Sequence, residues 1–137
     1  MKNIFADADY WIALLNPHDQ LHSKASSVSS KVQRLRIITT EMILVEVLNG
    51  LASKGPTLRS TAANFVEQIR SNANVSILPQ TSIQFQNALK FYKTREDKDW
   101  SLTDCASILA MQDGKITEIL SYDKHFAQAG FMPLLRE

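Results

Sequence analysis

Short apolar runs alternate along the chain with longer segments in which apolar side chains recur at helical spacing. The apolar runs lack the two-residue alternation of a strand with one wet face, so they indicate strands buried on both faces. These predicted strands are residues 4–6, 36–40, 74–78, 117–121 and 131–135. The periodic segments predict helices at residues 10–15, 19–32, 41–54, 57–72, 81–92 and 103–112.

Local signals mark where several of these helices begin and end. Thr40 can cap the helix that follows the second strand, and Thr81 and Gln84 have the spacing of a capping box. The Gly-Pro pair at residues 55–56 stops a helix, and the polar residues 93–99 predict a solvated loop. Because strands and helices alternate throughout the chain, we predict an α/β fold whose parallel sheet is covered on both faces.

Length and composition favour one globular domain over residues 1–137. A chain of 137 residues with 45% hydrophobic residues buries about two-thirds of its unfolded surface, which is enough for a core without disulfide or metal staples. The single cysteine, Cys105, has no partner within the chain, which favours a reducing, cytoplasmic compartment. Asp7 interrupts the first apolar run too early for a signal peptide, and no run approaches the roughly 20 apolar residues of a membrane span.

The total charge gives no overall basic footprint of the kind that indicates nucleic-acid binding. Fifteen Lys and Arg residues against fourteen Asp and Glu residues leave a net charge of +1. The positions of the acidic residues are therefore more informative than their number.

Two acidic residues follow predicted strands. Asp7 comes directly after the first strand, and Asp123 comes just after the fourth. Ligands of a parallel sheet bind beyond the carboxyl ends of its strands, where the chain order reverses, so both positions are candidate functional sites. An aspartate at such a place is also a common N-cap for the next helix, and this alternative stays open for each residue taken alone.

Two further acids lie inside predicted helices. Glu46 has almost only apolar neighbours, and a buried carboxylate must be paired, protonated or bound to a metal, so a Lys or Arg from elsewhere is the alternative partner. Asp104 follows Ser101 at the capping-box spacing, and the helix dipole holds a carboxylate in the first turn ionised. The cap and a role as a metal ligand are compatible for Asp104.

Carboxylates gathered at one edge of a sheet repel one another strongly, and a divalent cation relieves that repulsion. Mg²⁺ prefers oxygen ligands and is typically held by one or two carboxylates together with phosphate oxygens of the substrate. No Cys or His cluster accompanies these acids, which favours one or two Mg²⁺ or Mn²⁺ ions over Zn²⁺. The candidate ligands are Asp7, Glu46, Asp104 and Asp123.

Four short motifs extend over nearly the whole chain, and together they make a fairly specific set. They are IFADADYWIAL at residues 4–14, TT at 39–40 followed by VEVL at 45–48, SLTDC at 101–105 and SYDKHF at 121–126. On these motifs the chain resembles the PIN-domain ribonucleases, in particular the toxins of VapC-type toxin–antitoxin pairs.

The resemblance implies a three-layer α/β/α sandwich around a parallel sheet and a metal-dependent endonuclease that acts on RNA. It also implies a protein antitoxin as partner and a homodimer. A stand-alone RNA-processing nuclease and a non-catalytic PIN-like domain that binds a partner protein are the alternatives. In the family's pattern the metal-site acids fall on Asp7, Glu46, Asp104 and Asp123.

The chain departs from the family's pattern at two places. The family usually has a hydroxyl or amide side chain shortly after the first acid, whereas this chain has Asp9, which is open to three roles: a fifth site carboxylate, a helix cap or a substrate contact. The family often has a second acid or an Asn shortly after the last acid, whereas Lys124 and His125 follow Asp123 here. The resemblance therefore assigns no further acidic ligand for a second metal after Asp123.

Other residues are assigned supporting or structural roles. Thr103 and Ser121 can hydrogen-bond the phosphate or orient a carboxylate. Two basic clusters are candidate contacts for the RNA backbone, with ordinary solvated surface as the alternative. These clusters are Lys31, Arg34 and Arg36, and Lys90, Lys93, Arg95 and Lys98. The histidines His18 and His22 are expected on the surface, and the aromatic residues Trp11, Phe85, Phe91, Tyr92 and Trp100 in the core or in a subunit contact.

Two other families have a similar opening segment but lack support later in the chain. Asp7 and Asp9 fit the start of a haloacid-dehalogenase-like phosphatase, in which one aspartate is the nucleophile and the other a general acid, yet Trp11 stands where that family has Thr or Val. A response-regulator receiver domain needs a phosphoacceptor aspartate after its third strand, and residues 78–80 contain none.

Overall fold

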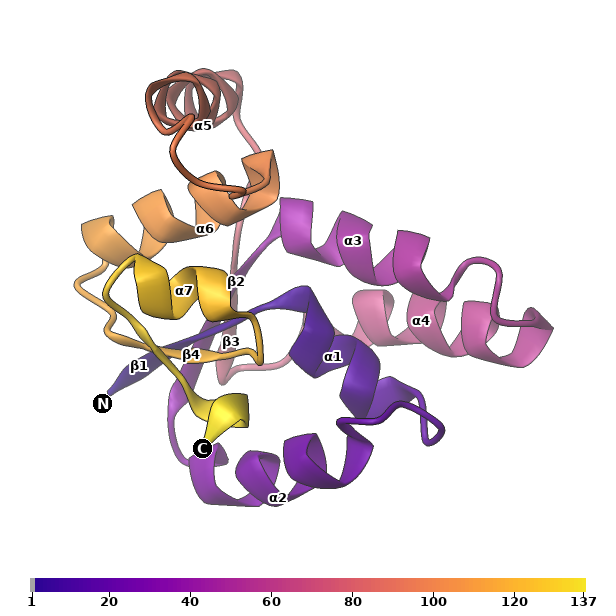
Figure 1. Cartoon of the computed structure of the whole chain (residues 1–137). Helices are drawn as coiled ribbons and strands as arrows, with labels where there is room; N and C mark the ends of the chain where they lie inside the picture. Colours follow the sequence, from indigo (N-terminus) through magenta and orange to yellow (C-terminus); the bar gives the residue numbers. More distant parts are fainter. Residues whose placement is uncertain (1) are drawn as a thin grey trace.

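Five parallel strands form one sheet in the computed structural model, which describes residues 2–137 (Figure 1). The strands are β1 (Asn3–Ala6), β2 (Arg36–Thr40), β3 (Val75–Leu78), β4 (Glu118–Leu120) and β5 (Met132–Pro133). Their order in the sheet is β3-β2-β1-β4-β5, so the direction in which the chain adds strands reverses between β1 and β4. Parallel sheets bind ligands at such a reversal, beyond the carboxyl ends of the strands.

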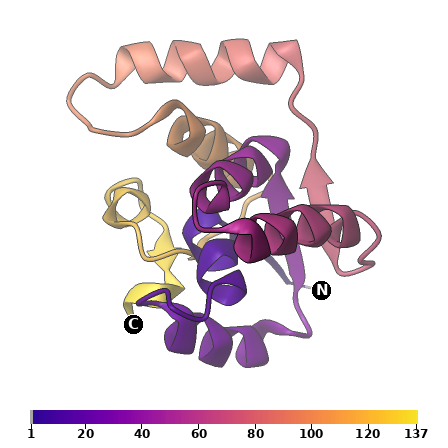
Figure 2. The same cartoon turned by 90° about the vertical axis from the view of Figure 1, so that its right-hand side faces the viewer.

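The helices form two groups that flank the sheet, and the predicted α/β fold with a central parallel sheet is confirmed. Helices α1 to α4 pack against one another, whereas α6 packs against both α5 and α7 on the other side of the molecule (Figures 1 and 2). The helices are α1 (Ala8–Leu15), α2 (His22–Val32), α3 (Glu41–Leu51), α4 (Pro56–Ile69), α5 (Ser82–Thr94), α6 (Leu102–Asp113) and α7 (Lys124–Gln128), followed by the 3₁₀ helix η1 (Leu134–Arg136).

The two central strands carry the most deeply buried side chains. Ile4 and Phe5 in β1 and Ile119 and Leu120 in β4 are fully buried. The pairing of these strands continues beyond β1, because the backbone N–H of Asp7 donates to the Leu120 carbonyl at 3.1 Å. The apolar core therefore fixes the position of the first residues beyond both strands.

The C-terminal segment differs from the sequence-based expectation. The short helix α7 was not predicted, and it forms because the Asp123 carboxylate accepts a hydrogen bond from the His125 backbone N–H at 2.9 Å. The predicted strand at residues 131–135 is wrong beyond Pro133, where η1 begins and the Leu135 N–H donates to the Ser121 carbonyl at 3.0 Å.

Helices α2, α3 and α4 are shorter than predicted, and α4 ends at Ile69 rather than at residue 72. Helix α2 begins at His22 rather than at residue 19, because the Asp19 carboxylate accepts the Leu21 N–H at 2.8 Å and holds a turn before the helix. Helix α3 ends at Leu51 rather than at residue 54. Within residues 2–137, no helix has the length and apolar character needed to cross a membrane.

The aromatic side chains divide into buried and exposed groups. Trp11 and Trp100 are buried as expected, and Trp100 packs against the partly buried Phe91 with ring centroids 5.9 Å apart. In contrast, Phe85 and Tyr92 on α5 are exposed. They are therefore not core residues, and α5 presents apolar surface to solvent.

Candidate active site

Three helices have an aspartate at the N-cap or in the first turn whose carboxylate accepts a backbone N–H. Asp7 caps α1 through the Ala8 N–H at 2.9 Å, and Asp123 caps α7. Asp104 forms a capping box with Ser101 at the start of α6, with both hydrogen bonds at 3.0 Å. The capping interpretation left open by the sequence therefore holds for all three. It does not compete with a functional role, because the caps fix the carboxylates at helix ends that favour negative charge.

Ser121 connects the carboxyl ends of β1 and β4. Its buried hydroxyl lies 3.0 Å from Asp7 Oδ2 and 3.2 Å from Asp9 Oδ2, so its one proton is shared between the two carboxylates. The same oxygen accepts the Asp123 backbone N–H at 3.0 Å. Ser121 thus holds three acidic residues in fixed positions relative to one another.

Asp9 is a member of the same cluster and not the cap of α1. Its Oδ2 atom accepts the Tyr122 backbone N–H at 2.8 Å, across 113 residues of sequence. Its Oδ1 atom is buried, and no group within residues 2–137 hydrogen-bonds to it. Burial raises the pKa of Asp9 to about 6. An ionised oxygen in such a position lacks a positive or hydrogen-bonding partner.

His125 lies between two of the predicted ligands, a position that sequence reasoning missed. Its Nδ1 atom is 3.0 Å from Asp104 Oδ2 and 3.2 Å from Asp123 Oδ1, and because ionised carboxylates only accept, Nδ1 is the donor. One potential ligand atom from each of these three residues lies within 4.8 Å of the other two. The sequence contains one signal for this helix, because Asp123, two positions before His125, is a residue type that caps helices. The helix itself has only five residues, which is too short to show helical periodicity.

Glu46 reaches the cluster from the middle of α3 and is half-buried. Burial raises the pKa of Glu46, and repulsion from Asp104 and other nearby acids adds to the effect, whereas a hydrogen bond from the Thr103 hydroxyl opposes it. Within residues 2–137, no Lys, Arg or His side chain forms an ion pair with Glu46. The alternative of a basic partner for Glu46 is therefore not found there.

The electrostatics of the cluster favour a bound cation. Burial and then the Asp9 carboxylate raise the pKa of Asp7 well above its ordinary value, although hydrogen bonds from Ala8 and Ser121 oppose the shift. The orphaned Asp9 oxygen, the oxygen-rich set of donors and the repulsion among the acids all fit a divalent metal ion. We call the set Asp7, Asp9, Glu46, Asp104, Asp123 and His125 the acid cluster.

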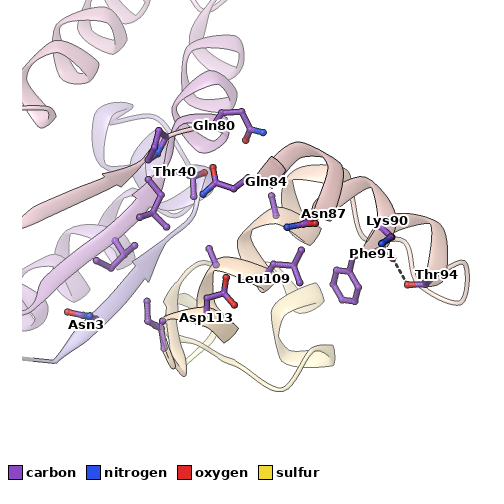
Figure 3. Close-up of a pocket in the computed structure, with 17 residues that line it drawn as sticks. Asn3, Thr40, Gln80, Gln84, Asn87, Lys90, Phe91, Thr94, Leu109 and Asp113 are labelled. Atoms are coloured by element: carbon purple, nitrogen blue, oxygen red, sulfur yellow. Dashed lines mark hydrogen bonds between the residues drawn. The ribbon is translucent and has the colours of Figure 1, made fainter. Parts of the chain in front are cut away.

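A cavity of about 780 Å³ lies away from this chemistry. It is bounded by α5, α6 and the ends of β2 and β3, and we call it the α5 groove. Figure 3 shows Gln84 and Asn87 from α5 and Leu109 and Asp113 from α6 lining the same space. No residue of the acid cluster lines it. This cavity therefore does not coincide with the charged groups.

The two basic clusters lie differently with respect to the acids. Arg36 is the first residue of β2 and donates to Ser76 at 2.7 Å, so the cluster of Lys31, Arg34 and Arg36 lies at the amino ends of the strands, opposite the acids. In the second cluster, Arg95 pairs with Asp97 at 3.0 Å and stacks over Trp100. The first cluster is therefore unsuited to bind RNA that enters the acid cluster.

Comparisons with known proteins agree with this architecture. The family model of the PIN domain matches residues 4–132. Among solved structures, the chain is similar to the crystal structure of Mycobacterium tuberculosis VapC20, a sarcin-ricin loop cleaving toxin, with a TM-score of 0.83 and 22% sequence identity over 94% of this chain and 96% of that chain. That similarity establishes a shared fold. No curated protein matches the sequence.

Proposed function

This chain belongs to the PIN domain family, and from this premise we propose that it is a metal-dependent endoribonuclease, the toxin of a type II toxin–antitoxin pair. The observation that carries the proposal is the convergence of carboxylates from four separate elements, held by hydrogen bonds and lacking a basic partner at Glu46. A complete set of acids also favours catalysis over the non-catalytic binding domain. The proposal treats residues 1–137 as one cytoplasmic nuclease domain.

We assign the metal site to Asp7, Glu46, Asp104 and Asp123, with one or two Mg²⁺ or Mn²⁺ ions as the cofactor. When bound, the metal lowers the pKa of a water molecule and neutralises charge on the scissile phosphate. The chain's own residues fix the ligands: Ser121 orients Asp7 through its hydroxyl, and Thr103 orients Glu46. Asp9 adds negative charge beside Asp7 without occupying the α1 cap.

RNA is the proposed substrate, and the fold shared with VapC20, a sarcin-ricin loop cleaving toxin, supports this assignment. We also propose an antitoxin partner and a homodimer. The exposed apolar side chains of α5 support a subunit contact, since contiguous exposed apolar surface often marks an interface. Phe85, Leu89 and Tyr92 are three such residues, and their spacing of four and three positions places them on one face of the helix.

The experiment that tests the proposal compares RNA cleavage by the parent protein with cleavage by Asp7→Asn and Asp104→Asn. Asp113→Asn is the matched control, because Asp113 ends the same helix as Asp104 but lines the α5 groove. We expect cleavage with Mg²⁺ or Mn²⁺ and none with a chelator. Each cluster substitution should reduce the rate of cleavage by more than about a hundredfold. This loss is larger than the one usually caused by removing a residue that only hydrogen-bonds a metal ligand.

The result that would contradict the assignment is cleavage by both cluster variants at the parent's rate. To separate a toxin from a stand-alone RNA-processing nuclease, the protein is expressed alone and with the product of the gene immediately upstream. Growth arrest that this product relieves supports the toxin, and growth without arrest supports the processing enzyme.

A further inference from the structure

Tyr122 is an exposed aromatic residue at the edge of the acid cluster. It lies between Ser121 and Asp123 in the turn from β4 to α7, and 45% of its surface is exposed. Neither burial in the core nor the cap of α7 explains an aromatic ring at this place, because Asp123 makes the cap and the ring remains in solvent.

The position of Tyr122 is held from both sides of its backbone. Its N–H donates to Asp9 Oδ2 at 2.8 Å, and its carbonyl accepts from Arg136 Nη1 at 2.6 Å. The Arg136 guanidinium also lies over the Tyr122 ring, 4.5 Å from its centroid. The buried Leu135 donates its N–H to the Ser121 carbonyl and so anchors Arg136 beside the turn. The ring and the guanidinium therefore form a fixed pair.

The chemistry of this pair suits a nucleotide. The acid cluster repels the phosphates of RNA, so a substrate needs attractive contacts at its edge. An aromatic ring stacks on the π-face of any unpaired base, and a guanidinium both stacks on aromatic groups and binds phosphate with paired donors. Tyr122 and Arg136 provide these two contacts, and the Tyr122 backbone joins them to Asp9 of the acid cluster.

We propose that Tyr122 and Arg136 form a nucleotide-binding platform, on which an unpaired base of the RNA stacks beside the scissile phosphate. This inference rests on the proposed ribonuclease function. It deepens that function by specifying the form of the substrate: a single strand or loop with a base free to leave its stack, rather than a continuous duplex. Arg136 contacts the phosphate backbone of the same segment.

The test measures binding in the Asp7→Asn variant, which prevents cleavage, using a short fluorescein-labelled single-stranded RNA and the same RNA annealed to its complement. We expect the single strand to bind more tightly. Tyr122→Ala should weaken its binding about tenfold, and Tyr122→Phe should restore it, because base stacking needs the ring and not the hydroxyl. Arg136→Ala should lower the slope of log Kd against log salt concentration by about one, and Arg136→Lys should restore that slope.

A second readout reports stacking directly. RNA in which 2-aminopurine replaces one base loses fluorescence when that base stacks. The fluorescence should therefore fall when this RNA binds the Asp7→Asn protein, and it should not fall when the protein also carries Tyr122→Ala. The matched controls are Met132→Ala, a large apolar residue of similar exposure in β5, and Arg34→Ala, an exposed arginine near the amino ends of the strands. Both should bind RNA as the background does.

The outcomes separate this inference from the function on which it rests. If Tyr122→Ala leaves RNA binding and quenching unchanged while the parent protein still cleaves RNA, the nucleotide platform is wrong and the proposed function stands. The absence of RNA binding and cleavage in the parent would overturn both proposals. If Tyr122→Ala instead weakens only the binding of the antitoxin, the surface docks protein and the nucleotide platform is wrong. Thermal melts of every variant establish that each is folded.

Discussion

The acid cluster and the α5 groove are two regions with opposite physical characters. The cluster holds carboxylates from α1, α3, α6 and α7 around the buried Ser121 hydroxyl, and burial raises the pKa of Asp7, Asp9 and Glu46. The groove offers about 780 Å³ of space but little concentrated charge. Uncompensated charge, rather than volume, therefore distinguishes the region to which we assign the chemistry.

Helix α6 contributes an aspartate to each region, and the two residues show how position determines role. Asp104 lies in the first turn, buried, capped by Ser101 and hydrogen-bonded by His125. Asp113 ends the helix and is exposed. The same side chain is thus held by directed hydrogen bonds in one region and solvated by water in the other.

The largest difference between the regions should appear in the pH dependence of stability without metal. The pKa of Asp9 is raised from 3.8 to about 6, so the folded state holds its proton more tightly than the unfolded state. The resulting stabilisation is complete below the unfolded pKa and is lost as pH rises through the folded pKa, a change of about 3 kcal/mol.

Urea unfolding in a chelator between about pH 4 and pH 8 measures this change. The stability of Asp9→Asn relative to the parent should rise across that interval, whereas Asp113→Asn should follow the parent. A constant difference between Asp9→Asn and the parent at every pH would show that Asp9 is not buried among like charges.

Removing the Ser121 hydroxyl should have the next largest effect. Ser121→Ala leaves Asp7 Oδ2 and the Asp123 N–H without their partner, which costs about 1–3 kcal/mol. It should also weaken Mn²⁺ binding by about ten- to a hundredfold, as measured by titration calorimetry. Ser76→Ala, which removes a partly buried hydroxyl on β3 that accepts from the exposed Arg36 side chain, should change stability by less than about 1 kcal/mol. Equal effects of the two substitutions would contradict the role given to Ser121.

The smallest effect is expected in the α5 groove. Leu109→Ala removes a partly buried side chain, which should lower stability by about 1 kcal/mol and leave Mn²⁺ affinity and RNA cleavage unchanged. Chemical unfolding and the cleavage assay check this expectation. A loss of cleavage comparable to that of Asp104→Asn would place the groove within the active site.

Local sequence was sufficient for the bounds of β2 and for the capping boxes of α5 and α6. The predicted boundaries of β2 and the capping box at Thr81 agree with the structure, because both depend on neighbouring residues. Apolar neighbours of Glu46 correctly indicated a carboxylate with restricted access to water. The roles of these acids in catalysis stay proposals.

Contacts between residues far apart in the sequence could not be predicted from local sequence. The Asp9 contact with the Tyr122 N–H joins residues 113 positions apart, so the sequence left three roles open for Asp9. His125 was missed because α7 has only five residues, too few for helical periodicity, and its importance comes from Asp104 on another helix. The segment after Pro133 is apolar like a strand, but its contact with Ser121 ends the sheet.

The central claim is that the acid cluster binds a divalent metal and the α5 groove does not. Crystals soaked in Mn²⁺ and measured at the manganese absorption edge test it directly, because anomalous scattering locates the ion without reference to activity. We expect an anomalous peak about 2.0–2.2 Å from carboxylate oxygens of Asp7 and Asp104, and no peak there in crystals of Asp104→Asn. Well-diffracting parent crystals with no peak at the acid cluster, or with a peak only in the groove, would contradict the claim.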